Sequence, residues 1–552
     1  MSLKMRVKAM EKLRCDVLVV GGGLAGLMAA IGARKYVEKV VLVSSAPVGR
    51  GGNTIVSGAG FSAYLGAEMP GDSEQQFFQD TFCGGAQIGD PALIQNLVEK
   101  AGPVLLQLEA AHGVKLKRRE GRVVRRRPPG HTFARMVTTV YSDYPYKVRG
   151  LSITQPLLRA LRTSRIICLD HYLAIELAVY DGQACGAYVL DSRGSGSLIG
   201  VNAKAVVLAA GGGGRLFSHS NNTNDITGDA YAMALRAGAE LRDMEFVQFY
   251  PTMGVKPVKV TISNSLFGHG AVLRNCSGER FMDRYDPRGD MATRDAMARA
   301  IFWEVARGNG VDGGVYLDCT GIGEDVLLGV YGELTNFLRK HGCDPTRDWL
   351  IVYPSTHFFC GGVKIDVQGY TGVPGLFAAG EATGGVHGAN RLAGNALSEA
   401  LVSGCCAGEA AGKFAAGMGS SLPPLPAPPV LPFQEKGSVS PEELGDTLRQ
   451  TLWQDASLVR DQQSLERARN TIMACERSLK TCRIANEHET KRYFQVRNMC
   501  LVARAVVEAA LRRKESRGTH YRRDFPQESE AYRGSFFIRL SGQDLVLEFR
   551  KQ

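Results

Sequence analysis

Apolar runs that lead into glycines open the chain. The run "CDVLVV" is followed by Gly21, Gly23 and Gly26, then by a helical stretch through Arg34 and by a second apolar run, "VVLV". Short apolar runs bounded by glycines are typical of strands that are buried on both faces. The pattern therefore predicts a strand, a tight turn, a helix and a second, parallel strand.

The glycines of this unit have the spacing G-x-G-x-x-G. The first makes the turn, the second lets the backbone approach a pyrophosphate, and the third lets the helix pack on the strand. The helix N-terminus then offers unpaired N–H groups to the anion. The second strand ends at Ser44 and Ser45 rather than at an acidic residue. We therefore expect a bound dinucleotide whose ribose is contacted by a neutral serine.

Two further strand-like runs lead into glycines far along the chain. "NAKAVVLAAGGGG" covers 202–214, and "GVPGLFAAGEATGG" covers 372–385 with Glu381 near its end. Their separation predicts one nucleotide-binding domain that is interrupted by an insertion. A glutamate placed for a second diol favours FAD over NAD, because FAD has a ribityl chain as well as a ribose. The expected fold class is α/β, with a Rossmann-like FAD-binding domain.

The pattern changes after residue 420. The run "SSLPPLPAPPVLP" predicts an extended, proline-rich linker at 421–432. Apolar residues then recur at intervals of three and four, which predicts a bundle of three helices, with Gly518 as a stop signal. The tail "SFFIRLSGQDLVLEFRKQ" predicts two strands joined by a turn at Ser541 and Gly542.

The composition is that of a folded protein with a basic excess. Of 552 residues, 44% are hydrophobic and 22% charged, and 66 Lys and Arg face 55 Asp and Glu, a formal charge of +11. This suits an acidic ligand or partner without requiring one. Much of the excess lies at 115–130, which is either a solvated hairpin or a docking patch for an acidic protein. Nucleic acid ranks below both, because no aromatic residues interleave there to stack on bases.

Cysteine spacing and hydropathy restrict the chemistry further. The 13 cysteines include no C-x-x-C pair, so neither iron–sulfur ligation nor a zinc site is expected, and no metal is predicted. An odd number without a framework suggests reduced cytoplasmic thiols. No apolar run reaches the ~18 residues of a membrane span. We therefore expect a cytoplasmic chain that meets a membrane only through partner subunits.

Longer motifs add up to a family resemblance. They are "VVGGGLAGLMAA", "GRGGNTIVSGAG", "TGDAYAMALRAGAELRDMEFVQFYPT", "GERFMDRYDP", "TRDAMARAIFWEV", "GLFAAGEATGGVHGANRLAGNALSEALVSG" and "RRKESRGTHYRRDFP". The chain resembles, nearly end to end, the flavoprotein subunits of the fumarate reductase/succinate dehydrogenase and L-aspartate oxidase family. The resemblance implies an FAD-binding domain at 1–235 and 350–420, an inserted α+β capping domain at 236–349, and a C-terminal helical domain with short terminal strands at 433–552.

The resemblance also implies how FAD is held. The helix beginning in "NALSEALVSG" would direct the N–H groups of Ala396, Leu397 and Ser398 at the flavin N1–C2=O edge, where reduced flavin is negative. Members with covalent FAD carry a histidine where this chain has Asn53, so non-covalent FAD is implied. Further FAD contacts are implied at Ala25, Gly52, Thr54, Ser57, Gly58, Ala174, Ala210, Gly211, Asn224 and Asp229.

On the substrate side, the resemblance implies a carboxylate held over the flavin. Members of the reductase branch exchange a hydride at flavin N5 and a proton with an arginine, which Arg294 matches. His357 and Arg391 match the pair that binds a substrate carboxylate, and an arginine fork suits that group. A plain alternative for Arg294 is an ion pair with Asp295 at the start of a helix.

Several positions depart from the reductase pattern. Tyr250 replaces a histidine and Ser263 replaces a threonine. Asn264, Phe267 and His269 replace a glutamate, an arginine and a second glutamate, so the side chains that pass protons to the catalytic arginine are missing. His269 titrates near neutrality and either substitutes for them or bonds backbone in a glycine turn. The expected substrate has one carboxylate, with its other end less charged or larger than that of fumarate.

Three functions compete at this point. The first is an FAD-dependent reductase or dehydrogenase of an organic acid other than fumarate or succinate, the catalytic subunit of a complex with an iron–sulfur partner. The second is a flavoprotein that only carries electrons, which the missing proton relay favours. The third is an L-aspartate oxidase-like enzyme, which the same departures disfavour. The retained arginines and histidine favour the first.

Overall fold

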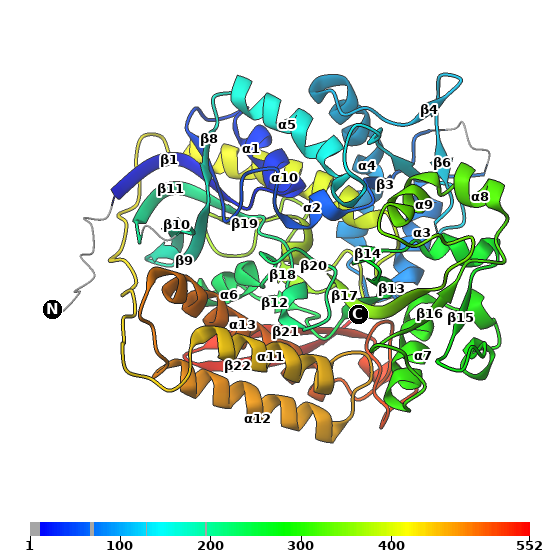
Figure 1. The fold of residues 1–552 in the computed structure, drawn as a ribbon. Helices are drawn as coiled ribbons and strands as arrows, with labels where there is room; N and C mark the ends of the chain where they lie inside the picture. Colours follow the sequence, from blue (N-terminus) through cyan, green and yellow to red (C-terminus); the bar gives the residue numbers. More distant parts are fainter. Residues whose placement is uncertain (1–10, 67–70, 129, 194–195) are drawn as a thin grey trace.

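The computed structural model describes residues 11–66, 71–128, 130–193 and 196–552 (Figure 1). A seven-stranded sheet forms the nucleotide-binding end. Its parallel strands are β8 (Ile167–Asp170), β2 (Val40–Ser44), β1 (Glu11–Val20), β11 (Leu198–Leu208) and β19 (Leu376–Ala378). Antiparallel β10 (Gln183–Asp191) and β9 (Tyr172–Tyr180) extend it beyond β11. Because β19 pairs with β11, the expected interrupted domain is confirmed.

Helices α1 (Leu24–Ala33) and α10 (Asn395–Gly417) pack against each other beside this sheet. Glycines recur every fourth residue on the α10 face that meets α1. A Cβ atom at Gly408 would lie 2.2 Å from the Ala29 carbonyl oxygen, so the contact requires glycine. The two helices run parallel, and both N-termini therefore face the same side of the sheet.

The inserted region contains a second, five-stranded sheet. Its order is β14 (Val260–Thr261), β13 (Val247–Lys256), β17 (Leu350–Phe359), β16 (Val315–Asp318) and β15 (Val272–Arg274). Helices α7 (Arg294–Ala306), α8 (Glu324–Gly329) and α9 (Gly332–Arg339) accompany it. Strand β17 begins at the predicted limit of the capping domain, and its backbone pairs with β13 and β16 of this sheet. The domain limits stay predictions.

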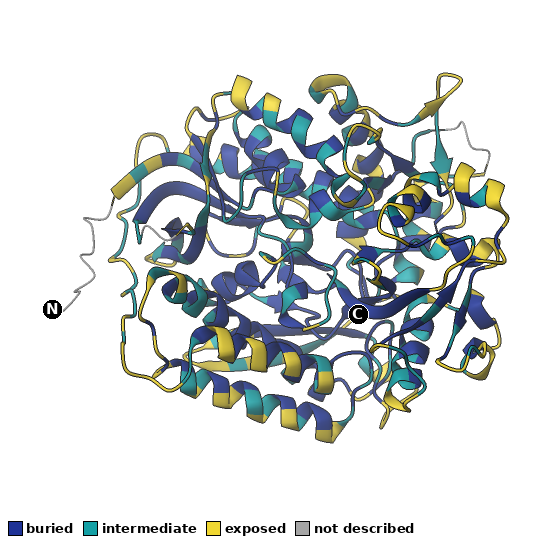
Figure 2. Cartoon of the chain, viewed as in Figure 1, coloured by how far each residue is buried: buried dark blue, intermediate teal, exposed yellow. Residues whose placement is uncertain are grey.

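The three helices expected after the linker are α11 (Pro441–Ala456), α12 (Gln462–Leu479) and α13 (Glu487–Arg512), and they pack on one another. In α11 and α12, buried and exposed residues alternate around the helix axis, as Figure 2 shows. Helix α13 ends at Arg512 rather than at Gly518. A Cβ atom at Gly518 would lie 2.4 Å from the Ala389 carbonyl oxygen, so this glycine permits a close approach instead of ending a helix.

The linker and the tail both lie against the sheets. The segment 421–432 has neither helix nor strand, and its Pro423 carbonyl accepts a hydrogen bond from Asn202 Nδ2 at 3.0 Å. The tail forms the expected hairpin of β21 (Gly534–Ser541) and β22 (Asp544–Lys551). Strand β21 also pairs with β12 (Leu241–Arg242), in a sheet with β18 (Gly362–Lys364) and β20 (Thr383–Gly384).

The basic stretch forms the hairpin β4 (Arg118–Arg119) and β5 (Arg122–Val123), followed by β6 (Arg125–Arg126), which pairs with β7 (Met136–Thr138). The hairpin arginines are exposed, and residue 129 lies outside the described residues. All 13 cysteines are free thiols. Within the described residues, no helix has the length and apolarity that a bilayer span needs.

Candidate active site

A cavity of about 430 Å³ extends from the turn after β1 to the capping region. Its nucleotide end is lined by the turns that follow β1, β2 and β11 and by the first turn of α10. The residues expected to bind FAD that line the cavity are Gly21, Gly23, Ala25, Ser44, Ser45, Gly52, Asn53, Thr54, Ser57, Gly58, Ala174, Ala210, Gly211, Asp229, Glu381, Arg391, Ala396 and Leu397.

Three residues expected to contact FAD do not line the cavity. A Cβ atom at Gly26 would lie 1.8 Å from the Gly21 carbonyl oxygen, so this glycine serves helix packing. Asn224 lines a neighbouring cleft. The Ser398 hydroxyl donates to the Ser62 carbonyl oxygen at 2.6 Å, which holds its side chain away from the cavity.

Two helix N-termini open onto the nucleotide end. Helix α1 follows Gly23 and α10 follows Gly394, and neither residue provides a side-chain cap. Gly21 has a φ of 120°, and a Cβ atom there would lie 2.2 Å from the Ala209 carbonyl oxygen. The N–H groups of the first turns and the parallel helix dipoles favour an anion. This cradle therefore fits the pyrophosphate of FAD.

Asn53 and Glu381 meet at the middle of the cavity. Asn53 Nδ2 lies 3.2 Å from Glu381 Oε2 and 2.8 Å from Asn222 Oδ1, and the Thr223 N–H donates to Asn53 Oδ1 at 3.3 Å. The Phe359 N–H donates to Glu381 Oε1 at 3.2 Å. Burial raises the pKa of Glu381 to about 7. The two side chains therefore form one hydrogen-bonded wall of the cavity, whose charge depends on pH near neutrality.

At the opposite end, two guanidinium groups face the cavity. Arg391 Nη2 donates to Gln248 Oε1 at 2.8 Å and Nη1 donates to the Leu392 carbonyl at 3.0 Å, while Nε is buried without a partner. Arg294 lies 5.2 Å over the Tyr250 ring, and its Nε is likewise unpartnered. Burial and the nearby Arg294 lower the pKa of Arg391 to about 10. Two neighbouring cations, the buried Arg391 and the half-buried Arg294, indicate that an anion binds between them.

The ion pair of Arg294 with Asp295, the alternative to a role at the substrate, is not formed. Asp295 pairs instead with Arg299, at 2.9 Å, one helical turn further along α7. Neither Arg294 nor Arg391 has a carboxylate within ion-pair distance in the part of the chain that the structure describes. Both charges are therefore available to a ligand.

His357 lies on β17 near these arginines. Burial lowers its pKa well below the usual value, and the charges of Arg391 and Arg294 lower it further. Its Nδ1 lies 3.0 Å from Asn221 Nδ2, and its ring lies 5.1 Å from that of Tyr250. Nδ1 also lies 3.1 Å from Asn221 Oδ1. In the neutral tautomer whose Nδ1 accepts from the Asn221 amide, Nε2–H is left to donate to a ligand.

The residues that depart from the reductase pattern separate into two groups. Tyr250 and Ser263 line the cavity. Phe267 is buried in the core of the capping region, and His269 is exposed with its ring 5.7 Å from that of Tyr331. Neither residue lines the cavity. The structure therefore gives no support to Phe267 facing the substrate, and the two alternatives for His269, a relay or a backbone bond in the glycine turn, stay predictions. The short helical turn that begins at Asn264 directs the Phe267 ring into the core and leaves His269, its last residue, exposed to solvent.

The polar atoms of Tyr250 and Asn264 contact backbone and sulfur rather than the Arg294 guanidinium. The Tyr250 hydroxyl donates to the Ile262 carbonyl at 2.8 Å and accepts from the Asn264 N–H at 3.2 Å. Asn264 Nδ2 lies 3.7 Å from Met297 Sδ, and its Oδ1 is buried without a partner. No carboxylate stands in this position to pass protons to Arg294.

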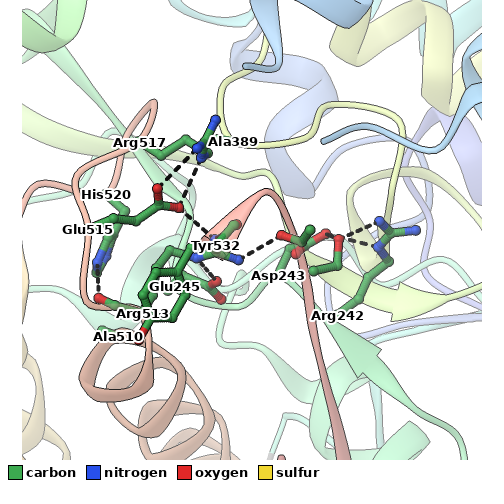
Figure 3. A network of polar contacts seen from close by, with 12 residues as sticks. Arg242, Asp243, Glu245, Ala389, Ala510, Arg513, Glu515, Arg517, His520 and Tyr532 are labelled. Atoms are coloured by element: carbon green, nitrogen blue, oxygen red, sulfur yellow. Dashed lines mark hydrogen bonds and ion pairs between the residues drawn. The ribbon is translucent and has the colours of Figure 1, made fainter. Parts of the chain in front are cut away.

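A buried network of ion pairs lies behind the turn that carries Arg391 (Figure 3). Arg513 pairs with Glu245 at 2.6 Å and with Glu515 at 2.8 Å. The adjoining Thr519 donates its N–H and its hydroxyl to the Ala389 carbonyl, at 3.0 and 3.1 Å. The motif "RRKESRGTHYRRDFP" thus holds the loop that presents Arg391, a role that its sequence did not indicate.

Comparison with known proteins decides the family. A family model described as FAD binding domain matches residues 16–397, more than half of the chain, and one described as Fumarate reductase flavoprotein C-term matches 445–541. The chain belongs to the fumarate reductase/succinate dehydrogenase flavoprotein family. It is an FAD-dependent oxidoreductase of this type, with FAD as its cofactor.

Relatives of this flavoprotein cover nearly its whole length. A fumarate reductase (CoM/CoB) subunit of Methanothermobacter marburgensis is 35% identical over 541 residues, covering 96% of this chain and 97% of that protein. L-aspartate oxidase of Pseudomonas aeruginosa is 32% identical, covering 93% and 95%. The structure of Mycobacterium smegmatis Sdh1 in complex with UQ1 has a TM-score of 0.86 at 32% identity, covering 98% and 95%.

Other cavity residues of the flavoprotein were missed in the sequence. Asn221 and Asn222 lie in the loop that follows β11 and its glycines, seven and eight residues after Gly214, and paired amides in a loop after a buried strand were an available signal. Tyr146, Arg149 and Tyr331 also line the cavity. They lie in segments without periodicity or motif, so the sequence carried no signal for them.

Proposed function

We propose that this flavoprotein is a reductase or dehydrogenase of a carboxylate-bearing organic acid other than fumarate or succinate. The observation that carries the proposal is the pair of guanidinium groups, Arg294 and Arg391, which line one cavity and each have a buried Nε without a partner. A site that only relays electrons has no physical need for two cations without carboxylate partners. An anionic substrate explains both.

FAD is held without a covalent bond in this proposal. Asn53 has a carboxamide where covalent members carry a histidine, and its amide is already bonded to Glu381 and Asn222. The glycine turn after β1 takes the pyrophosphate, and the first N–H groups of α10 take the negative edge of the ring system. Bound FAD supplies the hydride-transfer chemistry of the family.

The side chains of the site have separate roles in binding the substrate and in proton transfer. Arg391 and His357 bind one carboxylate, the arginine as a charged fork and the neutral histidine as a donor through Nε2. Arg294 exchanges the proton with the substrate carbon. The ring of Tyr250 lies against both Arg294 and His357 and orients them.

The route of protons to Arg294 differs from the family pattern. Asn264 carries no titratable group, and the Tyr250 hydroxyl is held between the Ile262 carbonyl and the Asn264 N–H. We infer that water in the cavity reprotonates Arg294. This difference supports a substrate other than fumarate, because the side chains that serve fumarate reduction in the family are absent.

We also infer that the chain works within a complex. The relative from Methanothermobacter marburgensis is named as one of the subunits of a fumarate reductase, and an iron–sulfur protein is the partner that the resemblance implies. An electron-carrying flavoprotein without a substrate is the second candidate. Only the absence of the side chains that pass protons to the arginine in the family favours this second candidate.

The test is anaerobic reoxidation of the reduced flavin by single acids. We expect at least one unsaturated acid to reoxidise it, and Arg294→Gln to slow that reaction by about 10²-fold or more while leaving the flavin spectrum unchanged. Fumarate at a full rate would contradict the substrate assignment. If no unsaturated acid reacts and Arg294→Gln matches the wild type in electron transfer to a partner, the second candidate is correct.

A further inference from the structure

The cavity continues past Tyr250 into an outer chamber between the segment 115–149 and the capping helices α8 and α9. We define this outer chamber by six lining residues, Arg126, Tyr141, Tyr146, Arg149, Tyr331 and Glu333. Four of them come from the segment before α5 (Leu151–Thr163) and two from the capping region. None of them belongs to the motifs that carry the carboxylate site.

The outer chamber is continuous with the carboxylate site. Tyr146 lies close enough to Tyr250 to raise its pKa further, beyond the effect of burial. On the other wall, the Tyr331 hydroxyl donates to Ser265 Oγ at 2.8 Å, and Ser265 Oγ lies 2.7 Å from Ser263 Oγ. A ligand bound at Arg391 and Arg294 can therefore extend along tyrosine and serine side chains into the chamber.

Cations outnumber carboxylates in the outer chamber. Arg149 lies 4.3 Å over the Tyr146 ring and donates through Nε to the Ser57 carbonyl at 3.4 Å. Lys117 Nζ lies 4.0 Å from the centre of the Tyr141 ring and 3.9 Å from Glu333 Oε1. Glu333 is the carboxylate that faces both Lys117 and Arg149.

Arg126 is the cation of the chamber that has no partner. Its side chain makes no ion pair or hydrogen bond with any residue in the described part of the chain. Its charge is near enough to Lys117 to lower the pKa of Lys117, which burial also lowers and Glu333 raises. It lines the cavity, whereas the adjacent Arg127 does not. Arg126 therefore lies near two other cations, Lys117 and Arg149, which share one carboxylate, Glu333. A bound anion would reduce the repulsion among these cations and stabilise Arg126.

We propose that the outer chamber is a second anion-binding subsite, which takes the distal anionic group of a substrate longer than a four-carbon diacid. The inference rests on the proposed function, because Arg391 and His357 hold the first carboxylate. Tyr146 and Tyr331 line the path of the connecting chain with amphipathic rings. The distal group is a carboxylate, sulfonate or phosphate that meets Arg126 and Arg149.

The test uses the holoprotein and the absorbance of its oxidised flavin, which reports binding without turnover. Saturated acids are titrated, namely the four-, six- and eight-carbon α,ω-diacids and the six- and eight-carbon monoacids. We expect the six- or eight-carbon diacid to bind about 10-fold more tightly than the monoacid of equal length, as one charge-assisted hydrogen bond allows. The same diacid should also bind more tightly than succinate.

Variants show which side chains cause the tighter binding of the long diacid. Arg126→Gln and Arg149→Met are expected to weaken binding of the long diacid by about 10-fold and to leave the Kd of succinate within about twofold. Arg127→Gln is the matched control, since it removes the same charge from an exposed neighbour off the cavity. Should Arg149→Met lose its flavin, the exposed Arg126 still tests the subsite.

Each contrary outcome has a distinct meaning. If Arg126→Gln and Arg127→Gln weaken the binding of every acid equally, the effect is a long-range attraction of anions, and the subsite is refuted. Succinate binding without any gain for longer diacids overturns the subsite and leaves the proposed function in place. If no acid perturbs the flavin, the proposed function fails and the subsite fails with it.

Discussion

At the residue scale, Glu381 shows how the cavity sets the charge of a side chain. Its carboxyl group is buried and is bonded by two neutral donors, the Asn53 amide and the Phe359 N–H. Burial outweighs both bonds and raises its pKa to about 7. The group therefore changes charge in the physiological range, at a place where the strand pattern predicts that it meets a diol.

We predict that Glu381 makes the flavin-free protein less stable as pH rises. A carboxyl group whose pKa is raised in the folded state stabilises the folded protein at low pH. This contribution is complete below about pH 4.5 and is lost as the pH rises through about 7. A shift from 4.5 to about 7 corresponds to about 3 kcal/mol. The measurement is the free energy of unfolding at pH 5 and pH 8, for wild type and Glu381→Gln. The wild type should lose about 3 kcal/mol more than the variant over this range, and equal losses would refute the assignment.

At the scale of elements, the contact of α1 with α10 positions the anion-binding end of the cavity. Gly404 and Gly408 let the backbone of α10 approach that of α1, with Cβ atoms at these positions 2.5 Å from the Ala25 oxygen and 2.2 Å from the Ala29 oxygen. Any side chain there pushes the helices apart. Since both N-termini line the cavity, separation of the helices also widens the FAD site.

We predict that Gly408→Ala lowers the free energy of unfolding by about 1–3 kcal/mol and lowers the FAD content of the purified protein. Gly417→Ala is the control on the same helix, because its Cβ would meet no atom within 4 Å. The control should leave stability unchanged or raise it by up to about 1 kcal/mol. Urea unfolding and the flavin absorbance measure the two effects. Similar losses in both variants would show that the helix contact is not the cause.

At the scale of the whole molecule, the buried ion network joins three distant parts of the chain. Glu245 lies just before β13 of the capping sheet, Ala389 lies in the turn before Arg391, and Arg513 follows α13 (Figure 3). Both side chains of the Arg513–Glu245 pair are fully buried. Removing the Glu245 charge leaves the buried Arg513 with Glu515 as its remaining carboxylate, and losing a buried partner is more costly than losing an exposed pair.

We predict that Glu245→Gln lowers the free energy of unfolding by about 3–5 kcal/mol. Asp312→Asn breaks the exposed pair of Asp312 with Lys256, at 2.7 Å, and should cost no more than about 1 kcal/mol. Urea unfolding of both variants gives the comparison. A loss in Glu245→Gln as small as that of the control would mean that the network does not join the three parts.

The sequence by itself determined the elements whose signals are local. Glycine spacing and apolar runs were sufficient for the nucleotide unit, whereas the role of Arg391 came from the family resemblance and stays a prediction. The tail hairpin with its turn at Ser541 and Gly542 was also predicted. These features depend on neighbours within a few residues, so periodicity and turn chemistry reveal them.

Only the tertiary structure decided what meets across long separations. It directed Phe267 into the core and His269 into solvent, although both belong to one short turn. It paired β17 with the capping sheet, and it assembled Arg126, Tyr146 and Tyr331 around one cavity. Which face of a turn is buried, and which segments share a cavity, follow from the packing of whole elements, and no local pattern in the chain records that packing.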